Sequence, residues 1–251
     1  MAKPQARELS VQRRSWVTKN MLRITLGGDA LKDFPQGQES AYIKLLFPQE
    51  SSDERPLMRT YTIRQQRPDE IDVDFVMHDE HGPASAWASE AEPGDKILVA
   101  GPGARKLISQ DGNWYLLVAD MTALPALSVN LENLPADARG YAVIEVRDEA
   151  DIQSLTHPEG LAIHWVINPS PCPEGRPLLE KVQVLPALPG TPSIWSASEF
   201  GSMRALRQYL RRTFDVPKAQ FYVSSYWKIG QTEDGHKQVK RRDSEEDTDA
   251  S

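Results

Sequence analysis

Cysteine is almost missing from this sequence of 251 residues, whose single thiol, Cys172, lies between two prolines. One thiol cannot form an internal disulfide, a cysteine-based zinc site or an iron–sulfur cluster, so no resident metal centre is expected. Any redox chemistry must therefore use an organic cofactor. We interpret Cys172 as a structural or neutral loop residue.

Long apolar runs and an excess of positive charge are missing as well. No stretch approaches the roughly 20 apolar residues of a membrane span, and residues 1–8 lack the apolar centre of a secretion signal. We therefore expect a cytoplasmic protein without a membrane segment. The formal net charge of −7 disfavours nucleic acid as a partner. Residues 233–251 are polar and charged, and we predict that they are disordered.

The first hundred residues have the pattern of a β domain. Residues 70–78 alternate, with Ile71, Val73 and Phe75 on one face, and turn signals such as Gly27-Gly28-Asp29 separate the candidate strands. Strands are expected over 9–17, 22–26, 41–47, 59–64, 70–78 and 96–100. Six short strands with regular turns predict a small closed antiparallel barrel, with one helix inserted at 82–91.

In the second half of the sequence, the spacing of the apolar residues changes. Residues 114–119 form a continuous apolar run, which is typical of a strand buried on both faces of a sheet. Further strands are expected over 141–146, 161–167, 194–197 and 221–227, and helices over 122–134, 178–184 and 199–213. This alternation predicts a mostly parallel, nucleotide-binding sheet. The expected domains are a barrel over 1–111, an α/β domain over 112–232 and the tail over 233–251.

Two segments of the predicted barrel have the chemistry of a flavin site. On the strand 59–64, Tyr61 offers a ring that can stack on an isoalloxazine, and Arg59 can bind a phosphate. Thr62 can reach the flavin's reactive nitrogen with its hydroxyl. The stretch Gly82-Pro83-Ala84-Ser85 predicts a helix start whose free amides face an anion. Taken singly, each segment also fits an ordinary strand or helix start.

Several motifs resemble one known family. They are RTYTIR (59–64), DFVMH (74–78), GPASAWA (82–88), AYIKLLFP (41–48), DMTALPA (120–126), RALRQYLR (204–211) and YWKIGQTEDGH (226–236). Together they are similar to the siderophore-interacting proteins, the flavin-dependent ferric-siderophore reductases of the ferredoxin-reductase-like group. The resemblance covers nearly the whole chain except the tail.

This resemblance implies an FAD-binding barrel followed by an NAD(P)H-binding-like domain. The cofactor contacts that it implies are Arg59, Tyr61 and Thr62 for the ring and phosphate, Val76 and His78 along the ring, Ala84 and Ser85 at the diphosphate, and Trp87 as a ligand contact or a packing residue. Trp227, at the end of the last strand, either covers the flavin or packs in the core. No acid or base of the protein is required for outer-sphere electron transfer, so no catalytic residue is predicted.

The implied reaction is the reduction of a ferric siderophore, with release of iron as Fe(II) by one-electron transfer from reduced FAD. Hard anionic oxygen ligands hold iron(III) more tightly than iron(II), so one electron loosens the metal. Ferric catecholates are anionic, and the candidate basic contacts are Lys44, Lys228, His236 and Lys237. Protons are expected from water or from His236.

The sequence departs from the family at the expected donor side. It reads Ala119-Asp120-Met121-Thr122 where the family often has Gly-Asp-Glu-Thr, and Ala197-Ser198-Glu199 where the family often has Ala-Gly-Glu. NADH, NADPH and reduced ferredoxin therefore all remain candidate electron donors. Two alternative functions also remain: a general flavin or ferredoxin-type reductase, and a non-catalytic protein that binds ferric siderophores. A monomer is expected.

Overall fold

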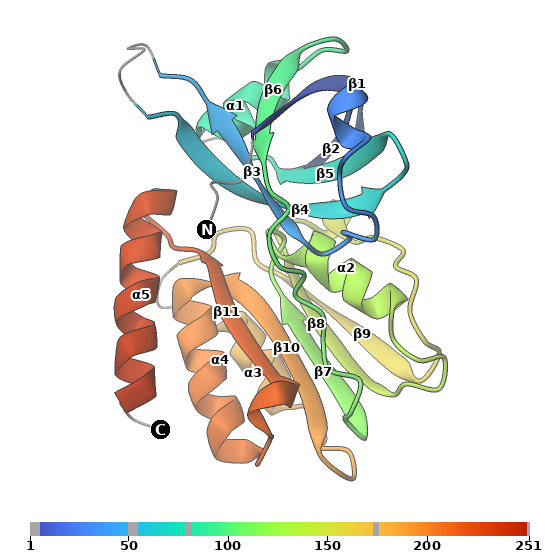
Figure 1. Ribbon diagram of the computed structural model, residues 1–251. Coiled ribbons are helices and arrows are strands. Elements are labelled where there is room, and N and C mark those ends of the chain that lie inside the picture. Colours follow the sequence, from blue (N-terminus) through green and yellow to red (C-terminus); the bar gives the residue numbers. More distant parts are fainter. Residues whose placement is uncertain (1–5, 50–54, 79–81, 173–175, 250–251) are drawn as a thin grey trace. The chain divides into compact units, whose positions relative to one another are not determined.

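The structure is a computed structural model that describes residues 6–49, 55–78, 82–172 and 176–249. The chain forms two compact units, and its elements are labelled in Figure 1. The first unit contains residues 1–107, 125–132 and 148–156, and the second contains the remainder. Among the described residues, no helix is long and apolar enough to cross a membrane. The same residues contain no group of three or more His, Cys, Asp or Glu side chains that could hold a metal ion.

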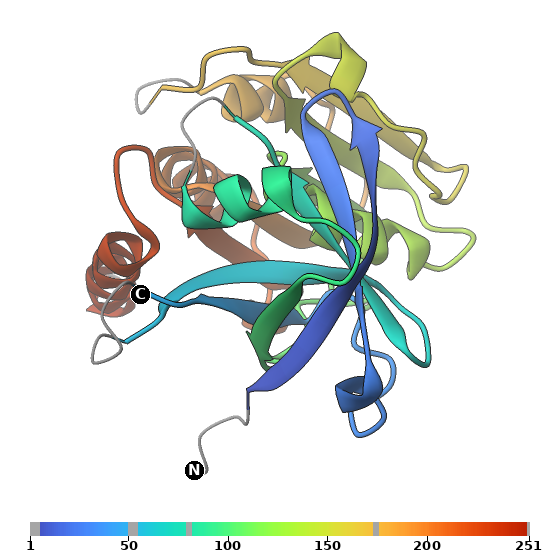
Figure 2. The same ribbon diagram turned by 90° about the horizontal axis from the view of Figure 1, so that it is seen from above.

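The described part of the first unit contains a closed barrel of six antiparallel strands in the order β1-β2-β5-β4-β3-β6, which confirms the predicted architecture. The strands are β1 (Arg7–Thr18), β2 (Met21–Gly27), β3 (Tyr42–Phe47), β4 (Leu57–Gln66), β5 (Glu70–Val76) and β6 (Lys96–Ala100). The helix α1 (Pro83–Glu90) follows β5 and contacts β3 and β5 (Figure 2). A short 3₁₀ turn, η1 (Asp29–Leu31), follows β2.

The alternation of β5 explains how the barrel is filled. Ile71, Val73 and Phe75 are fully buried in the barrel core, as their spacing predicts. Asp72 and Asp74, on the opposite face, are also almost fully buried. A buried carboxylate is tolerated only where it is paired, and arginine side chains supply that pairing here.

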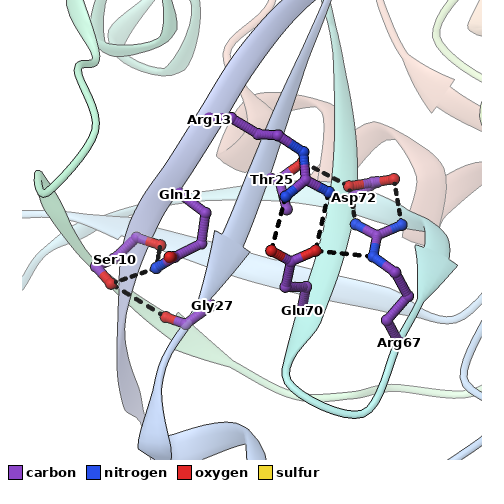
Figure 3. Close-up of polar contacts among 8 residues, drawn as sticks. All are labelled: Ser10, Gln12, Arg13, Thr25, Gly27, Arg67, Glu70 and Asp72. Atoms are coloured by element: carbon purple, nitrogen blue, oxygen red, sulfur yellow. Dashed lines mark hydrogen bonds and ion pairs between the residues drawn. The ribbon is translucent and has the colours of Figure 1, made fainter.

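Asp74 pairs with Arg23 of β2 at 2.6 Å. Asp72 belongs to an ionic network that joins β1, β2, β5 and the turn before β5 (Figure 3). Arg67 contacts Asp72 at 2.6 Å and Glu70 at 2.8 Å, and Arg13 contacts Glu70 at 2.7 Å. Thr25 donates its hydroxyl to Asp72 at 2.7 Å. The hydrogen bond to Asp72 is the largest influence that raises the pKa of Arg67, so its guanidinium stays charged. The network holds the outer faces of three strands together.

Two later segments belong to the barrel unit. Residues 125–132 are held by a two-bond ion pair between Arg64 and Glu132, with contacts of 2.5 and 3.2 Å. Residues 148–156, which include η2 (Glu149–Asp151), are held by Asp151. Its carboxylate accepts hydrogen bonds from Thr18 and from the backbone and side chain of Asn20. The two units therefore interleave along the chain, whereas the sequence predicts one boundary near residue 111.

In the second unit, the described residues form a parallel sheet of five strands in the order β11-β10-β7-β8-β9, as predicted. The strands are β7 (Trp114–Ala119), β8 (Gly140–Val146), β9 (Leu161–Ile167), β10 (Pro192–Glu199) and β11 (Phe221–Trp227). The helix α2 (Leu124–Glu132), whose residues 125–132 belong to the first unit, connects β7 to β8 along the chain, and η3 (Lys218–Gln220) precedes β11. On one face of the sheet, Leu116, Val118 and Val143 pack against α3 (Pro177–Gln183) and α4 (Phe200–Thr213).

The structure of residues 233–249 differs from the disorder that the sequence predicts for the tail. A helix, α5 (Glu233–Asp249), occupies most of the segment for which the sequence predicts disorder (Figure 1). Tertiary contacts within the second unit explain the difference: Arg207 of α4 holds Asp243 through two hydrogen bonds of 2.8 and 2.9 Å. Lys240 donates to the hydroxyl of Ser224 at 2.7 Å and to the carbonyl of Ser225 at 2.8 Å. Composition alone does not reveal such long-range partners.

Candidate functional site

The aromatic part of the candidate site lies on β4. Tyr61 is half-buried, with its ring centroid 4.3 Å from that of Phe75. Phe75 is 5.9 Å from Trp87 of α1, and Trp87 is 6.2 Å from Phe47. The core beneath Tyr61 therefore fixes its ring, while the exposed part can meet a planar ligand. Trp87 packs against the barrel core, which supports the packing alternative for this residue.

The two arginines of RTYTIR have different environments. Arg64 is engaged by Glu132, as described above. Arg59 is half-buried and donates one hydrogen bond of 2.9 Å to the carbonyl of Met58. A guanidinium has five N–H groups, so one such bond leaves Arg59 with donors for a phosphate. Thr62, on the other face of the strand, is almost buried at 9% exposure.

The start of α1 supplies backbone donors. Gly82 is the extended N-cap, Pro83 is the first helical residue, and the first intrahelical bond runs from Ala86 N to the Gly82 carbonyl at 2.9 Å. Helix geometry leaves the earlier amides, those of Ala84 and Ser85, without an intrahelical acceptor. The Ser85 hydroxyl itself donates to the Gly82 carbonyl at 3.0 Å. Apart from Gly82 and its chain neighbours, no heavy atom of the described residues lies within 4 Å of the point where a Cβ would stand on Gly82.

The donor set of this part of the barrel fits FAD. It combines a supported aromatic ring, a guanidinium with further N–H groups and two backbone amides at a helix start, which match a flat ring and a diphosphate. The two remaining predicted contacts are Val76 and His78. Val76 is the last residue of β5 and is half-buried, and His78 lies just after the strand and is exposed. The structure thus places all the predicted cofactor residues on β4, the end of β5 and α1 of one unit.

The predicted substrate residues fall in both units. Lys44 is half-buried on β3 of the barrel. Lys228 follows β11 in the second unit, with its ammonium 4.6 Å from the ring centroid of Phe200. Lys237 forms ion pairs of 3.0 and 3.1 Å with Glu233 and Asp234. The structure brings Lys228 and His236 together around Phe200, since the rings of His236 and Phe200 are 6.5 Å apart.

The surroundings of His236 indicate that the residue has a structural role. It is buried at 5% exposure and its Nε2 lies 2.8 Å from the Ser225 hydroxyl. Burial, reinforced by the charge of Lys240, lowers the pKa of His236 to about 4. The imidazole is therefore neutral at pH 7, so it brings no positive charge to an anionic substrate and holds no acidic proton to donate. This differs from the expected role, and the reason is that His236 lies on α5, which packs against β11 and buries the ring there.

Sequence reasoning missed a group of carboxylates at the carboxyl ends of the parallel strands. Asp120 follows β7, Glu145 lies near the end of β8 and Glu199 ends β10. Burial raises the pKa of Glu145 from 4.5 to about 7, and the negative charge of Asp120 is the next cause. The motif DMTALPA signals Asp120, but the sequence does not show that Asp120 accepts a hydrogen bond of 2.7 Å from the Trp227 indole, 107 residues away.

The fold and the site define a flavoprotein-like barrel joined to a parallel α/β unit, and comparison with known proteins places the chain in a family. Residues 112–230 match the siderophore-interacting protein family, and residues 10–54 and 50–106 match the siderophore-interacting FAD-binding domain. The chain belongs to the siderophore-interacting proteins, as the sequence motifs indicate.

Three proteins illustrate the similarity of this chain to other members of the family. The chain is 33% identical to the ferric vibriobactin reductase ViuB of Vibrio cholerae, over 92% of each chain. It is 31% identical to the NADPH-dependent ferric-chelate reductase of Escherichia coli, over 88% of this chain and 92% of that one. The crystal structure of the siderophore-interacting protein SipS from Aeromonas hydrophila superimposes with a TM-score of 0.86 at 34% identity, covering 96% of this chain and 99% of that chain.

Proposed function

We propose that this protein is an FAD-dependent reductase of ferric siderophores that releases iron as Fe(II). The observation that carries the proposal is the donor set around Tyr61, Arg59 and the start of α1, in a barrel that matches a siderophore-interacting FAD-binding domain. The likeness to two relatives named as ferric reductases supports the reaction class. Bound FAD supplies the conversion of a two-electron donor into single electrons for iron.

The residues of the barrel bind and orient the cofactor. Tyr61, fixed by Phe75, supports the ring, and the Thr62 hydroxyl serves as a hydrogen-bond partner beside it. Arg59 and the amides of Ala84 and Ser85 hold the diphosphate. We assign the amide of Ser85 to this role because its hydroxyl is engaged with Gly82. Val76 and His78, at the end of β5, line the ring.

The substrate is an anionic ferric complex, and lysines of the chain attract it. Lys44 and Lys228 carry positive charge at neutral pH and are the proposed contacts, with Lys237 at the edge of the same region as Lys228. The neutral His236 positions α5 and is not a substrate contact. Protons for the released ligand come from water. NAD(P)H or reduced ferredoxin supplies the electrons, while a cytoplasmic location and a monomeric state remain predictions from the sequence.

One experiment separates this function from its alternatives. The purified protein is reconstituted with FAD, reduced anaerobically with dithionite, and mixed with a ferric catecholate or ferric hydroxamate in the presence of an iron(II) chelator. The proposal predicts a yellow protein whose flavin is reoxidised as the iron(II) complex appears. A protein that binds the ferric complex but no flavin is a non-catalytic binder. A protein that reduces free flavin but leaves the chelated iron untouched is a general flavin reductase.

A further inference from the structure

The parallel sheet of the second unit has two border strands, β11 on one side and β9 on the other (Figure 1). A border strand presents unpaired N–H and C=O groups to which another chain can add a strand, so proteins usually cover it or give it charges. The β11 border is covered: α5 contacts this strand, and Lys240 donates to the Ser225 carbonyl at 2.8 Å and to the Ser224 hydroxyl at 2.7 Å. The β9 border is different.

Two hydrogen bonds show which backbone groups of β9 point outward. The Asn168 amide donates to the Val146 carbonyl at 2.8 Å, and the Gly140 amide donates to the Gly160 carbonyl at 3.2 Å, so the even-numbered residues of this segment bond β8. Successive residues of a strand direct their backbone groups to opposite sides. The odd-numbered residues therefore point their N–H and C=O groups away from β8. Within the described residues, no hydrogen bond reaches the outward groups of residues 163–167.

The side chains of β9 do not protect this border. The strand reads LAIHWVI and contains no lysine, glutamate, aspartate, arginine, proline or glycine, which are the residues that keep sheet borders apart. Ile163, Trp165 and Ile167 share one face of the strand. Ile167 is 44% exposed and the other two are half-buried. Branched and aromatic side chains of this kind pair well across neighbouring strands.

The sequence of β9 complements itself when it is reversed about its central residue, His164. In an antiparallel pair with that centre, Ile163 of one copy lies opposite Trp165 of the second copy. Both are odd-numbered, so outward groups meet outward groups and the two residues exchange both backbone hydrogen bonds. Apolar side chains then face apolar side chains along the whole strand. The remaining opposite pairs are Leu161 with Ile167 and Ala162 with Val166.

The ends and the centre of this pair have particular environments. The Leu161 amide already donates to the Pro158 carbonyl at 3.1 Å, so at that end only the Leu161 carbonyl is offered to a second copy. His164 lies on the two-fold axis, opposite its own copy. Its ring lies 5.9 Å from the ring of Tyr141 on β8. Burial, followed by the charge of Lys181, lowers the pKa of His164 from 6.5, so the two rings bring no charge to the axis at pH 7.

We propose that β9 binds the β9 strand of a second copy of this chain, in a two-fold dimer whose parallel sheets join through an antiparallel pair. The covered β11 border keeps the assembly at two copies, because it offers no second site for strand addition. One seven-residue strand from each copy makes an interface toward the small end, below about 1,200 Å², so the dimer dissociates on dilution. This dimer is an alternative to the monomer expected from the sequence, and it does not depend on the proposed reaction.

The first test is sedimentation equilibrium of the purified full chain, with FAD present, over about a hundredfold range of concentration. The weight-average mass should rise from that of one chain, 28.2 kDa, toward twice that value. Ile167→Lys places a charge opposite an apolar residue of the second copy and should weaken association about tenfold or more. Leu98→Lys is the matched control, because Leu98 is 40% exposed on β6, a strand that is paired on both sides. A mass of one chain at every concentration, or equal weakening by both variants, overturns the proposal.

The second test fixes the register by cross-linking. Cys172→Ser removes the single thiol of the chain, and a new cysteine is then added on β9. In His164→Cys the two thiols face each other across the axis, where opposite Cα atoms are about 4.5 Å apart and can form a disulfide. Ala162→Cys is the control, since Ala162 is exposed on the same face but lies opposite Val166.

On oxidation with copper phenanthroline, His164→Cys should form the covalent dimer at least about tenfold faster than Ala162→Cys. Equal or faster cross-linking of Ala162→Cys overturns the two-fold axis at His164. The mass measurement on the unaltered protein and on Ile167→Lys decides the dimer itself, whether or not His164→Cys folds.

Discussion

Replacing Glu145 with glutamine should stabilise the protein at alkaline pH and change it little at acid pH. Glu145 is 8% exposed, and the pKa of its carboxyl rises from 4.5 to about 7 through burial and the neighbouring negative charges. A folded state with a raised carboxyl pKa holds its proton more tightly than the unfolded chain does. The free energy of unfolding therefore falls as pH rises from about 4.5 to about 7, and the whole penalty applies above that range.

The magnitude follows from the same two pKa values. At about 1.4 kcal/mol for each factor of ten in proton affinity, the rise from 4.5 to about 7 costs the folded state about 3 kcal/mol at pH 8. At pH 5 the cost is about 1 kcal/mol, because there the folded carboxyl is still protonated. Glutamine has no proton to lose. For a chain of this size, about 3 kcal/mol corresponds to a rise of about 6–12 °C in the unfolding midpoint.

The assay is thermal unfolding of Glu145→Gln and of the unaltered FAD-loaded protein at pH 5 and pH 8. The difference between their midpoints should be large at pH 8 and shrink at pH 5. Glu159→Gln, an exposed position in the same unit, should show no such pH dependence. An equal midpoint difference at both pH values would refute the reasoning, because it would mean that Glu145 titrates alike in the folded and unfolded chain.

Three further predictions concern the site and the last helix. Tyr61→Ala should weaken FAD binding about tenfold while Tyr61→Phe keeps it, because the ring does the stacking; equal affinities by flavin fluorescence would exclude Tyr61 from the site. Neutralising Lys44 and Lys228 to glutamine should raise KM at low salt about threefold or more for an anionic ferric catecholate, and less for a hydroxamate; equal shifts would remove both lysines from the substrate site. Asp243→Asn should speed tryptic cleavage within α5, because Arg207 loses its charged partner; unchanged cleavage would show that another contact holds the helix.

The barrel and the parallel sheet could be predicted from local patterns of apolar and turn residues. The alternation of residues 70–78 and the turn signals around each strand are local properties, and burial of one face then requires the strands to close. The apolar run of Trp114–Ala119 likewise reports burial on both faces of a parallel sheet. The candidate cofactor residues were proposed for a similar reason, since Tyr61 and the start of α1 each combine a residue type with a local geometry.

Long-range pairing explains what the sequence does not reveal. Asp120 and Trp227 are distant in the chain, and only the parallel register of β7, β10 and β11 brings their ends together. The α5 segment is polar, and its helix depends on Asp243 and His236 finding partners on α4 and β11. The same burial changes the interpretation of His236 from a charged contact to a neutral packing residue.

We propose that a flavin held by this barrel passes electrons to chelated iron. The most direct test is a single anaerobic mixing experiment in which the reduced, FAD-loaded protein meets a ferric catecholate, with flavin absorbance and iron(II) chelation recorded together. Two equivalents of iron(II) are expected for each flavin reoxidised, since the flavin carries two electrons and iron takes one. Chelated iron that stays ferric while the flavin remains reduced would contradict the proposal.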